Sequence, residues 1–318
     1  MQRPRRRHAL AAALVITVTA GCGSATASTG AGPETPNVSV AVVATESVAG
    51  LYIAQNQGYF HKLGLHVTVK TVTSASEALP ALLHGSVDVV AGQYTTFIQA
   101  QAAGTGQFRV LAPGWNLGPH VEELLVPKQS PIFTVPQLRG QTIAVNAIGG
   151  IDQIITDSLL RGYDIQPGQV HFVAIPFQAM GAALAAHRVD AAYLSEPYIT
   201  EAEQQHGAQV LFDADTGATQ GLPVAGYTAL KSWALRYPRT AAAFAHAIDE
   251  GNAQVTLNPG VFQKAMEDQL HLTKLVADVM APGTFPIGIN AISLQRVANI
   301  LFEYGALKKQ FNVSGMLS

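Results

Sequence analysis

The pattern of apolar and polar residues between positions 142 and 161 predicts a strand, a tight turn and a helix in close succession. Residues 142–145 are a short apolar run, two adjacent glycines follow at 149 and 150, and apolar residues then recur at helical spacing up to position 161. The predicted stripe consists of Ile151, Ile154, Ile155, Ser158 and Leu159. A helix that begins directly after a strand presents unpaired backbone N–H groups at the edge where open α/β sheets bind small ligands.

The same pattern occurs a second time, 102 residues earlier. Residues 40–44 align with 142–146, and residues 81–88 align with 183–190. Both members of the latter pair end in an aspartate. Two ordinary strand–helix–strand units that merely share common patterning are the alternative. We favour a true duplication, because strand, turn, helix and aspartate all keep the same offset. The chain is therefore predicted to contain two α/β lobes of similar topology with a cleft between them.

The first residues have the pattern of an export signal. Four arginines precede an apolar run over residues 9–20, which is too short to span a bilayer, so residues 1–21 are predicted to be a signal peptide. Cys22 follows Thr19-Ala20-Gly21 and is the single cysteine of the chain. This segment resembles a bacterial lipobox, although Leu is more usual at the position of Thr19. We expect Cys22 to be lipidated and residues 22–37 to be a flexible tether; a conventional leader that removes Cys22 is the alternative.

Composition then excludes some classes of protein. The chain has 318 residues, of which 48% are hydrophobic and 13% charged, which suits two folded domains of ordinary size. Removal of residues 1–21 takes away four arginines and no acidic residue, which leaves 15 basic and 21 acidic side chains. Because no basic run remains, binding to nucleic acid is not expected.

Several short motifs resemble the solute-binding proteins that serve nitrate, sulfonate, taurine and thiamine-precursor ABC importers. They are the helix ending in Gly58-Tyr59-Phe60, the turn Leu63-Gly64-Leu65, Gly85-Ser86-Val87-Asp88, Leu138-Arg139-Gly140 and Glu196-Pro197. The resemblance implies an α/β protein with the periplasmic-binding-protein type II fold, in which a two-segment hinge joins two lobes. Residues 38–126 and 228–318 would form the first lobe, and residues 127–227 the second.

Residues at predicted strand ends and helix starts are the candidates for ligand binding. The 102-residue offset places Gln93 and Tyr94 opposite Ser195 and Glu196, so that each lobe offers polar groups to the cleft. The complete candidate set is Glu46, Ser47, Gln93, Tyr94, Thr95, Trp115, Asn116, Gly149, Gly150, Ser195, Glu196, Tyr198 and Tyr227.

The chemistry of the ligand stays open between two classes. Helix N-termini near Ser47 and Gly150 favour an anion such as a sulfonate or nitrate. Glu46 and Glu196 oppose a bound anion, and the aromatic candidates could enclose a planar ring. We therefore favour a neutral or cationic heteroaromatic ligand, such as a thiamine-precursor pyrimidine.

The resemblance also implies partners and a location. We expect a monomer on the extracytoplasmic face of the membrane that delivers its ligand to an ABC permease and ATPase, with no cofactor and no enzymatic activity. A pyrimidine-synthase-like enzyme on the same fold would need a reactive His or Lys in the cleft, for which His120 is the one nominee. A ligand sensor for a membrane kinase is a further alternative. Ten histidines without zinc-site spacing predict no metal centre.

Overall fold

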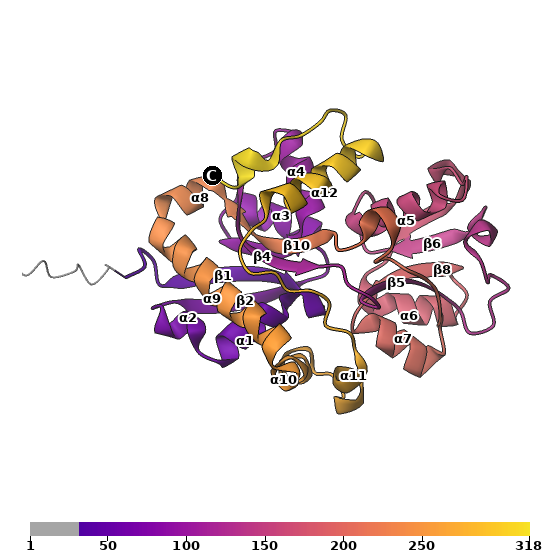
Figure 1. The fold of residues 1–318 in the computed structure, drawn as a ribbon, viewed down its shortest axis with the longest axis horizontal. Coiled ribbons are helices and arrows are strands. Elements are labelled where there is room, and N and C mark those ends of the chain that lie inside the picture. The colour runs from indigo at the N-terminus through magenta and orange to yellow at the C-terminus, as the bar shows by residue number, and fades with distance from the viewer. Residues whose placement is uncertain (1–31) are drawn as a thin grey trace, which may run out of the picture. The chain divides into compact units, whose positions relative to one another are not determined.

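The computed structural model describes residues 32–318, which form one compact unit (Figure 1). The predicted signal peptide, Cys22 and residues 22–31 of the predicted tether lie outside the described residues. Between residues 32 and 318, no helix has both the length and the apolar character required to cross a membrane.

The first of two five-stranded sheets has the strand order β2-β1-β3-β10-β4. β1 pairs in parallel with β2 and β3, and β10 runs antiparallel between β3 and β4. The strands are β1 (Asn37–Val43), β2 (His66–Val72), β3 (Val89–Gln93), β4 (Phe108–Asn116) and β10 (Pro223–Leu230). The helices between them are α1 (Ala49–Asn56), α2 (Tyr59–Lys62), α3 (Ala75–Leu83) and α4 (Tyr94–Ala102).

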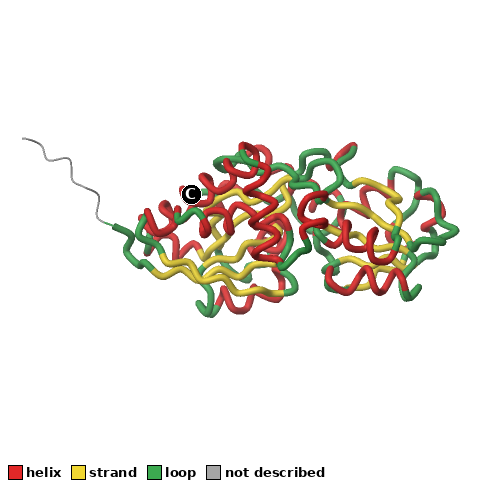
Figure 2. Tube along the Cα trace, turned by 90° about the horizontal axis from the view of Figure 1, so that it is seen from below, coloured by secondary structure: helices red, strands yellow, loops and turns green. Residues whose placement is uncertain are grey.

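The second sheet repeats this plan with the order β7-β6-β8-β5-β9. β6 is parallel to β7 and β8, and β5 runs antiparallel between β8 and β9. The elements are β5 (Glu122–Val126), β6 (Thr142–Val145), α5 (Ile151–Arg161), β7 (His171–Ala174), α6 (Phe177–Ala185), β8 (Ala191–Ser195), α7 (Tyr198–His206) and β9 (Gln209–Asp213). Figure 2 shows helices on both sides of the strands in each sheet.

The predicted duplication is present in the structure. The bounds of β3 and β8 differ by 102 residues, and so do those of α3 and α6. The first strand of each lobe departs from this offset by one residue, because Val40 pairs with Val89 whereas Ile143 pairs with Ala191.

The repeated aspartate has a structural role in both lobes. The Asp88 carboxylate accepts hydrogen bonds from the Ser39 backbone N–H at 2.8 Å and from the Ser39 hydroxyl at 2.7 Å. The Asp190 carboxylate accepts one from the Thr142 N–H at 2.8 Å. Each aspartate therefore satisfies a backbone donor of the strand that precedes the first helix of its repeat, β1 or β6.

The two strands that follow the chain crossings do not lie where the predicted lobe boundaries put them. β5 was expected in the first lobe, but it pairs with β8 in the second sheet, with Glu122 opposite Ser195. β10 belongs wholly to the first sheet, although its first five residues were expected in the second lobe. The chain therefore crosses between the sheets over residues 117–121 and 214–222, and the Leu117 N–H donates to the Leu222 carbonyl at 2.9 Å.

The described end of the predicted tether is held against the fold. The Glu34 carboxylate accepts hydrogen bonds from the backbone N–H groups of Arg239 at 3.0 Å and Thr240 at 2.8 Å. These groups open α9 (Pro238–Leu257) and have no partner within the helix. Residues 34–37 are thus part of the folded unit, and β1 begins at Asn37.

From Lys231 onward the chain is mainly helical, as predicted. α8 (Lys231–Arg236) and α9 are followed by α10 (Pro259–Leu270), α11 (Lys274–Val279) and α12 (Ala291–Glu303). α9 lies along α1 (Figure 1), and Phe244 of α9 stacks on Phe60 with ring centroids 5.4 Å apart. These helices complete the core of the first lobe.

Candidate functional site

A small chamber of about 30 Å³ lies where the strand ends of both sheets meet. Strands β1, β3, β4 and β10 contribute from the first sheet, and β5 and β8 from the second. The lining residues are Val43, Thr45, Ser47, Ala75, Ala91, Gly92, Gln93, Trp115, Glu122, Asn146, Phe177, Ser195, Val224 and Ala225. This space holds about two water molecules, so side chains of the protein fill most of the cleft.

The two lobes touch directly around this chamber. The Ser195 hydroxyl donates to the Glu46 carboxylate at 2.9 Å, and the Gln93 side-chain amide donates to the Asp152 carboxylate at 2.8 Å. The Tyr198 hydroxyl donates to the Ala44 carbonyl at 2.9 Å. The structure therefore describes a closed arrangement in which each lobe satisfies polar groups of the other.

Glu122 lines the chamber, and three more buried carboxyl groups lie behind or beside the lining residues: Glu46 and Asp152, bonded to Ser195 and Gln93, and Glu196, next to Ser195 in the chain. Burial, with the nearby Glu122 carboxyl as a further cause, raises the pKa of Glu46 well above its usual range. Burial likewise raises the pKa of Glu122, of Asp152 to about 6, and of Glu196 to about 7. No Lys, Arg or His is among the lining residues in the described part of the chain. The site is consequently short of positive charge.

Side chains of the first turn of α5 accept hydrogen bonds from the turn before that helix, which the sequence suggested as part of an anion site. The Asp152 carboxylate, in the first turn of α5, accepts the Asn146 backbone N–H at 2.9 Å. The Gly149 N–H donates to the Gln153 side-chain oxygen at 2.8 Å. Gly149 has a left-handed φ of 73°, which a residue with a side chain adopts only with strain. An external anion at this helix start would lie close to the buried Asp152 carboxyl group.

Some of the predicted site residues meet at the chamber. Ser47, Gln93, Trp115 and Ser195 line it, and Glu46 lies directly behind Ser195. The indole N–H of Trp115 donates to the Pro282 carbonyl at 3.1 Å, so its ring is fixed as a wall. Trp115 lies in β4.

The two glycines lie beside these residues. The Gly149 carbonyl accepts a hydrogen bond from the Gln99 side chain at 2.8 Å, across the lobe boundary. Gly150 precedes α5, and a Cβ atom there would lie 3.3 Å from the Gln93 side-chain oxygen. Both positions keep the backbone close to the opposite lobe.

Other predicted residues lie away from the chamber. Tyr94 and Asn116 line a separate cavity of about 40 Å³ between β4, β10 and α12. Thr95 is fully buried in α4 and its hydroxyl has no partner. The Tyr227 ring packs edge-on against Phe244, with centroids 5.6 Å apart. These residues lie in α4, β4 and β10 and face the interior of the first lobe, because other elements of that lobe pack over them.

Glu196 and Tyr198 are engaged in contacts other than the predicted ones. The Glu196 carboxylate accepts the N–H and hydroxyl of Thr200 at 3.2 and 2.8 Å, and the Ala281 N–H at 3.4 Å. The Tyr198 ring stacks on Phe177 with centroids 6.0 Å apart. Glu196 thus anchors α7 and the segment after α11, and it does not line the chamber.

The sequence analysis missed several residues of the site. These are Thr45, Glu122, Asn146, Asp152 and Phe177. Glu122 and Glu123 are adjacent acids at the start of an otherwise apolar strand, which is a visible signal for a functional carboxylate. Asp152 was hidden because the segment was interpreted only for its apolar stripe.

Comparison with known proteins identifies the family. The sequence profile described as NMT1/THI5 like matches residues 45–261, which is more than half of the chain. The chain belongs to this family. Among curated proteins, this NMT1/THI5-like chain is 26% identical over 218 residues to YtlA of Bacillus subtilis (strain 168), whose name assigns it a provisional binding role. The match covers 66% of this chain and spans 64% of the length of YtlA.

Solved structures agree on the fold. The alkanesulfonate-binding protein SsuA from Xanthomonas axonopodis pv. citri, bound to MOPS, superposes with a TM-score of 0.76 at 19% identity, over 91% of this chain and 99% of that one. The periplasmic nitrate-binding protein NrtA from Synechocystis PCC 6803 superposes with a TM-score of 0.73 at 15% identity, over 87% and 84% of the two chains. The NMT1/THI5-like chain therefore has the periplasmic-binding-protein fold that its sequence motifs predicted.

Proposed function

We propose that this protein is an extracytoplasmic, lipid-anchored solute-binding protein that captures a small cationic or N–H-donating aromatic heterocycle and delivers it to an ABC importer. An amino-substituted pyrimidine, as in thiamine precursors, is the ligand type that fits best. The observation that carries this proposal is a chamber whose described lining includes the buried Glu122 carboxyl group and no basic side chain. The buried carboxyl groups of Glu46 and Asp152 are bonded to the lining residues Ser195 and Gln93. Membership of the NMT1/THI5-like family and the two-lobed fold support the transport role.

The chamber offers two kinds of contact to such a ligand. Trp115 and Phe177 provide flat apolar walls, and Gln93, Glu122 and Asn146 provide hydrogen-bond acceptors. A planar ring with N–H groups would use both at once, because its faces are apolar and its edge is polar. Charge-assisted hydrogen bonds to carboxylates are stronger than those between neutral groups.

Binding and lobe closure are expected to be linked. In the closed arrangement the Ser195 hydroxyl and the Gln93 amide donate to Glu46 and Asp152. Once the lobes open to admit a ligand with N–H groups, these groups would donate hydrogen bonds to the two carboxylates in place of some of the protein's own donors. Its free energy of binding would then shift the equilibrium toward a closed form that a permease can recognise.

An anionic ligand is the less favoured class. The two structural neighbours are an alkanesulfonate-binding and a nitrate-binding protein, and both of these ligands are anions. In this chain an anion would lie against Glu46, Glu122 and Asp152, and their repulsion would disfavour it unless all three were protonated. We also propose that the protein is not an enzyme, since the described chamber lining contains neither His nor Lys.

Thermal unfolding against a ligand panel tests the proposal. The full-length chain carrying Cys22→Ser would be scanned at pH 7.5 with aminopyrimidines, alkanesulfonates and nitrate. A ligand at about a hundred times its dissociation constant adds roughly 2.7 kcal/mol, which raises the unfolding temperature by several degrees. We expect such a shift with aminopyrimidines, and we expect Glu122→Gln to reduce it while Glu303→Gln, on the exposed end of α12, leaves it unchanged. A shift with sulfonates or nitrate alone would contradict the proposed ligand class.

A further inference from the structure

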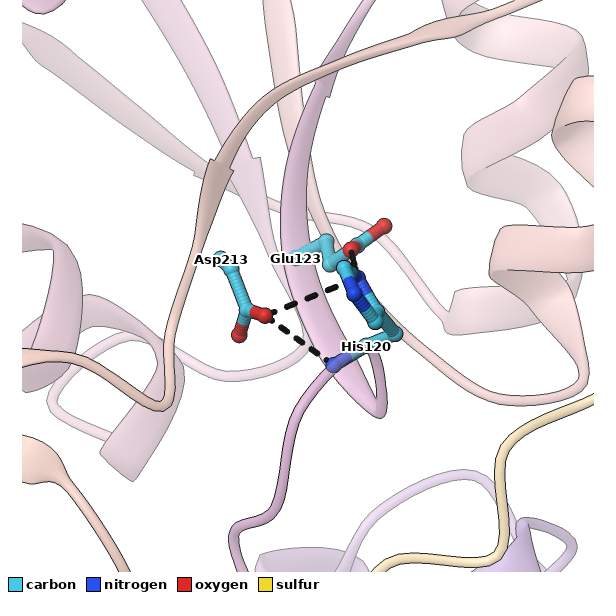
Figure 3. Close-up of side chains that lie close together, drawn as sticks. All are labelled: His120, Glu123 and Asp213. Carbon is cyan, nitrogen blue, oxygen red and sulfur yellow. Dashed lines mark hydrogen bonds and ion pairs between the residues drawn. The ribbon is translucent and has the colours of Figure 1, made fainter.

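A second cluster of functional side chains lies at the chain crossings, on the face of β5 opposite to the chamber. Glu122 and Glu123 are consecutive in this strand, so their side chains point to opposite faces. Glu123 is paired with Asp213 in the antiparallel register of β5 and β9. His120 precedes β5 within the first crossing segment. Figure 3 shows these three side chains converging from β5, β9 and the crossing.

The atoms of this cluster are spaced as ligands of one metal ion. His120 Nδ1 lies 2.9 Å from Glu123 Oε1 and 3.6 Å from Asp213 Oδ2, and the three ligand atoms all lie within 4.8 Å of one another. Nitrogen and oxygen ligands bind Zn²⁺ at about 2.0–2.2 Å, which puts them roughly 3.3 Å apart in a tetrahedron. Small side-chain rotations would bring all three atoms to that spacing.

The charges of the cluster call for a cation. Glu123 is 2% exposed and lies opposite a second carboxylate, an arrangement that destabilises a pair of strands. Within residues 32–318, His120 is the one positively chargeable group paired with either of them.

The backbone holds the histidine over the two carboxylates. His120 has a left-handed φ of 63°, which is uncommon for a residue other than glycine. Its backbone N–H donates to Asp213 Oδ2 at 3.0 Å, and this bond fixes the turn. The His120 side chain is 75% exposed, so a fourth coordination position would be open to water or to a further ligand.

We propose that His120, Glu123 and Asp213 form a binding site for a divalent transition-metal ion, with Zn²⁺ as the natural occupant. Zinc sites with three protein ligands leave the fourth position to water or another ligand. Because His120 lies in the first crossing segment and Asp213 directly precedes the second, a bound ion would tie the two segments together. The site is separate from the ligand chamber and does not depend on the proposed transport function.

Isothermal titration with zinc chloride tests this proposal. The full-length chain with Cys22→Ser, which removes the single thiol, would be titrated at pH 7.5, and we expect one tight site. His120→Asn keeps a residue that tolerates the left-handed backbone, and Asp213→Asn keeps one of the two side-chain acceptors of the turn. Loss of one direct ligand should weaken zinc binding by at least about tenfold, since even second-shell changes cost 10–100-fold.

The matched control is His187→Asn. His187 is also an exposed histidine with a left-handed φ, of 50°, and it lies in the second lobe after α6. Its replacement should leave zinc affinity unchanged. Equal affinity in the parent chain and in His120→Asn would overturn the proposal, as would an equal loss in His187→Asn.

A second measurement needs no variant. Zinc K-edge absorption spectroscopy on the parent chain at one equivalent of zinc should show one imidazole among oxygen ligands. A shell with two or more imidazoles would place the zinc on other histidines and would overturn the proposed site.

Discussion

β3 and β8 occupy the same position in their respective sheets, yet they bring different side chains to the chamber. β3 ends in Gln93 and β8 in Ser195, 102 residues apart, and each donates a hydrogen bond to a carboxylate of the opposite lobe. By contrast, Asp88 and Asp190 perform the same structural task in both lobes. The shared residues therefore hold the scaffold, whereas the residues that differ make the site.

The acidic residues show the same division. Glu46 enters the site from the first lobe, and Glu122 and Asp152 enter it from the second. None of the three has an acidic counterpart at the 102-residue offset, since Ile148, Val224 and Gly50 stand there. The carboxyl groups were thus placed in each lobe independently, and this is expected when a ligand must contact both lobes at once.

The largest expected effect is on the pH dependence of folding stability. It is expected from Glu196, which anchors one lobe to the other, and not from ordinary surface acids. Its folded-state pKa of about 7 lies above the usual value of 4.5, so the folded state holds a proton that the unfolded state releases. The stabilisation is complete below pH 4.5 and is lost as pH rises to 7, by on the order of 3 kcal/mol. Urea unfolding from pH 4.5 to 8 should show this fall.

The Glu196→Gln variant should lose that part of the pH dependence, because glutamine does not titrate. Glu303→Gln, at an exposed position, should keep it. A parallel pH profile in Glu196→Gln and the parent chain would remove Glu196 as the source.

The next effect concerns the scaffold that the lobes share. Asp88→Ala and Asp190→Ala each leave a strand N–H without its carboxylate partner, which should cost about 2 kcal/mol of unfolding free energy. Asp88→Ala should lower the unfolding free energy slightly more, because it also leaves the Ser39 hydroxyl without its acceptor. Urea denaturation measures both.

Asp268→Ala, at an exposed ion pair, is the control and should change stability by less than about 0.5 kcal/mol. If one of the two scaffold variants behaved like this control, the equivalence of the lobes would be broken.

A smaller effect is expected at the residues that close the lobes. Gln93→Ala and Ser195→Ala each remove one hydrogen bond between the lobes and leave a buried carboxylate less satisfied, at a cost of about 1 kcal/mol. Small-angle scattering without ligand should show a larger radius of gyration in both variants. Ser76→Ala, on the exposed side of α3, should leave it unchanged. An unaltered radius in both variants would mean that these bonds do not hold the closed form.

The sequence predicted most of the scaffold and only part of the site. The bounds of β6 and α5 match the predicted ones residue for residue, because apolar periodicity and the glycine turn are local signals. The pairing of β5 with β8 was not predicted, since the partner of an apolar strand depends on distant residues. Tyr94 and Tyr227 were expected in the cleft because they are aromatic residues near strand ends, but packing turns both into the first lobe.

The cluster of His120, Glu123 and Asp213 was not predicted for the same reason. His120 and Glu123 are three residues apart, but Asp213 joins them only through the β5–β9 pairing. The search for zinc-site spacing along the sequence could not detect that contact.

The most direct test of the central claim compares two ligands that share a benzene ring and carry opposite charges. Benzamidine and benzenesulfonate both carry a planar ring, the first with a cationic N–H group and the second with an anion. Isothermal titration of the Cys22→Ser chain at pH 8 should show binding of benzamidine alone. That binding should weaken at pH 5, where Asp152, with a pKa of about 6, takes up its proton. Binding of benzenesulfonate in preference to benzamidine at pH 8 would contradict a chamber selected for cations by its buried carboxyl groups.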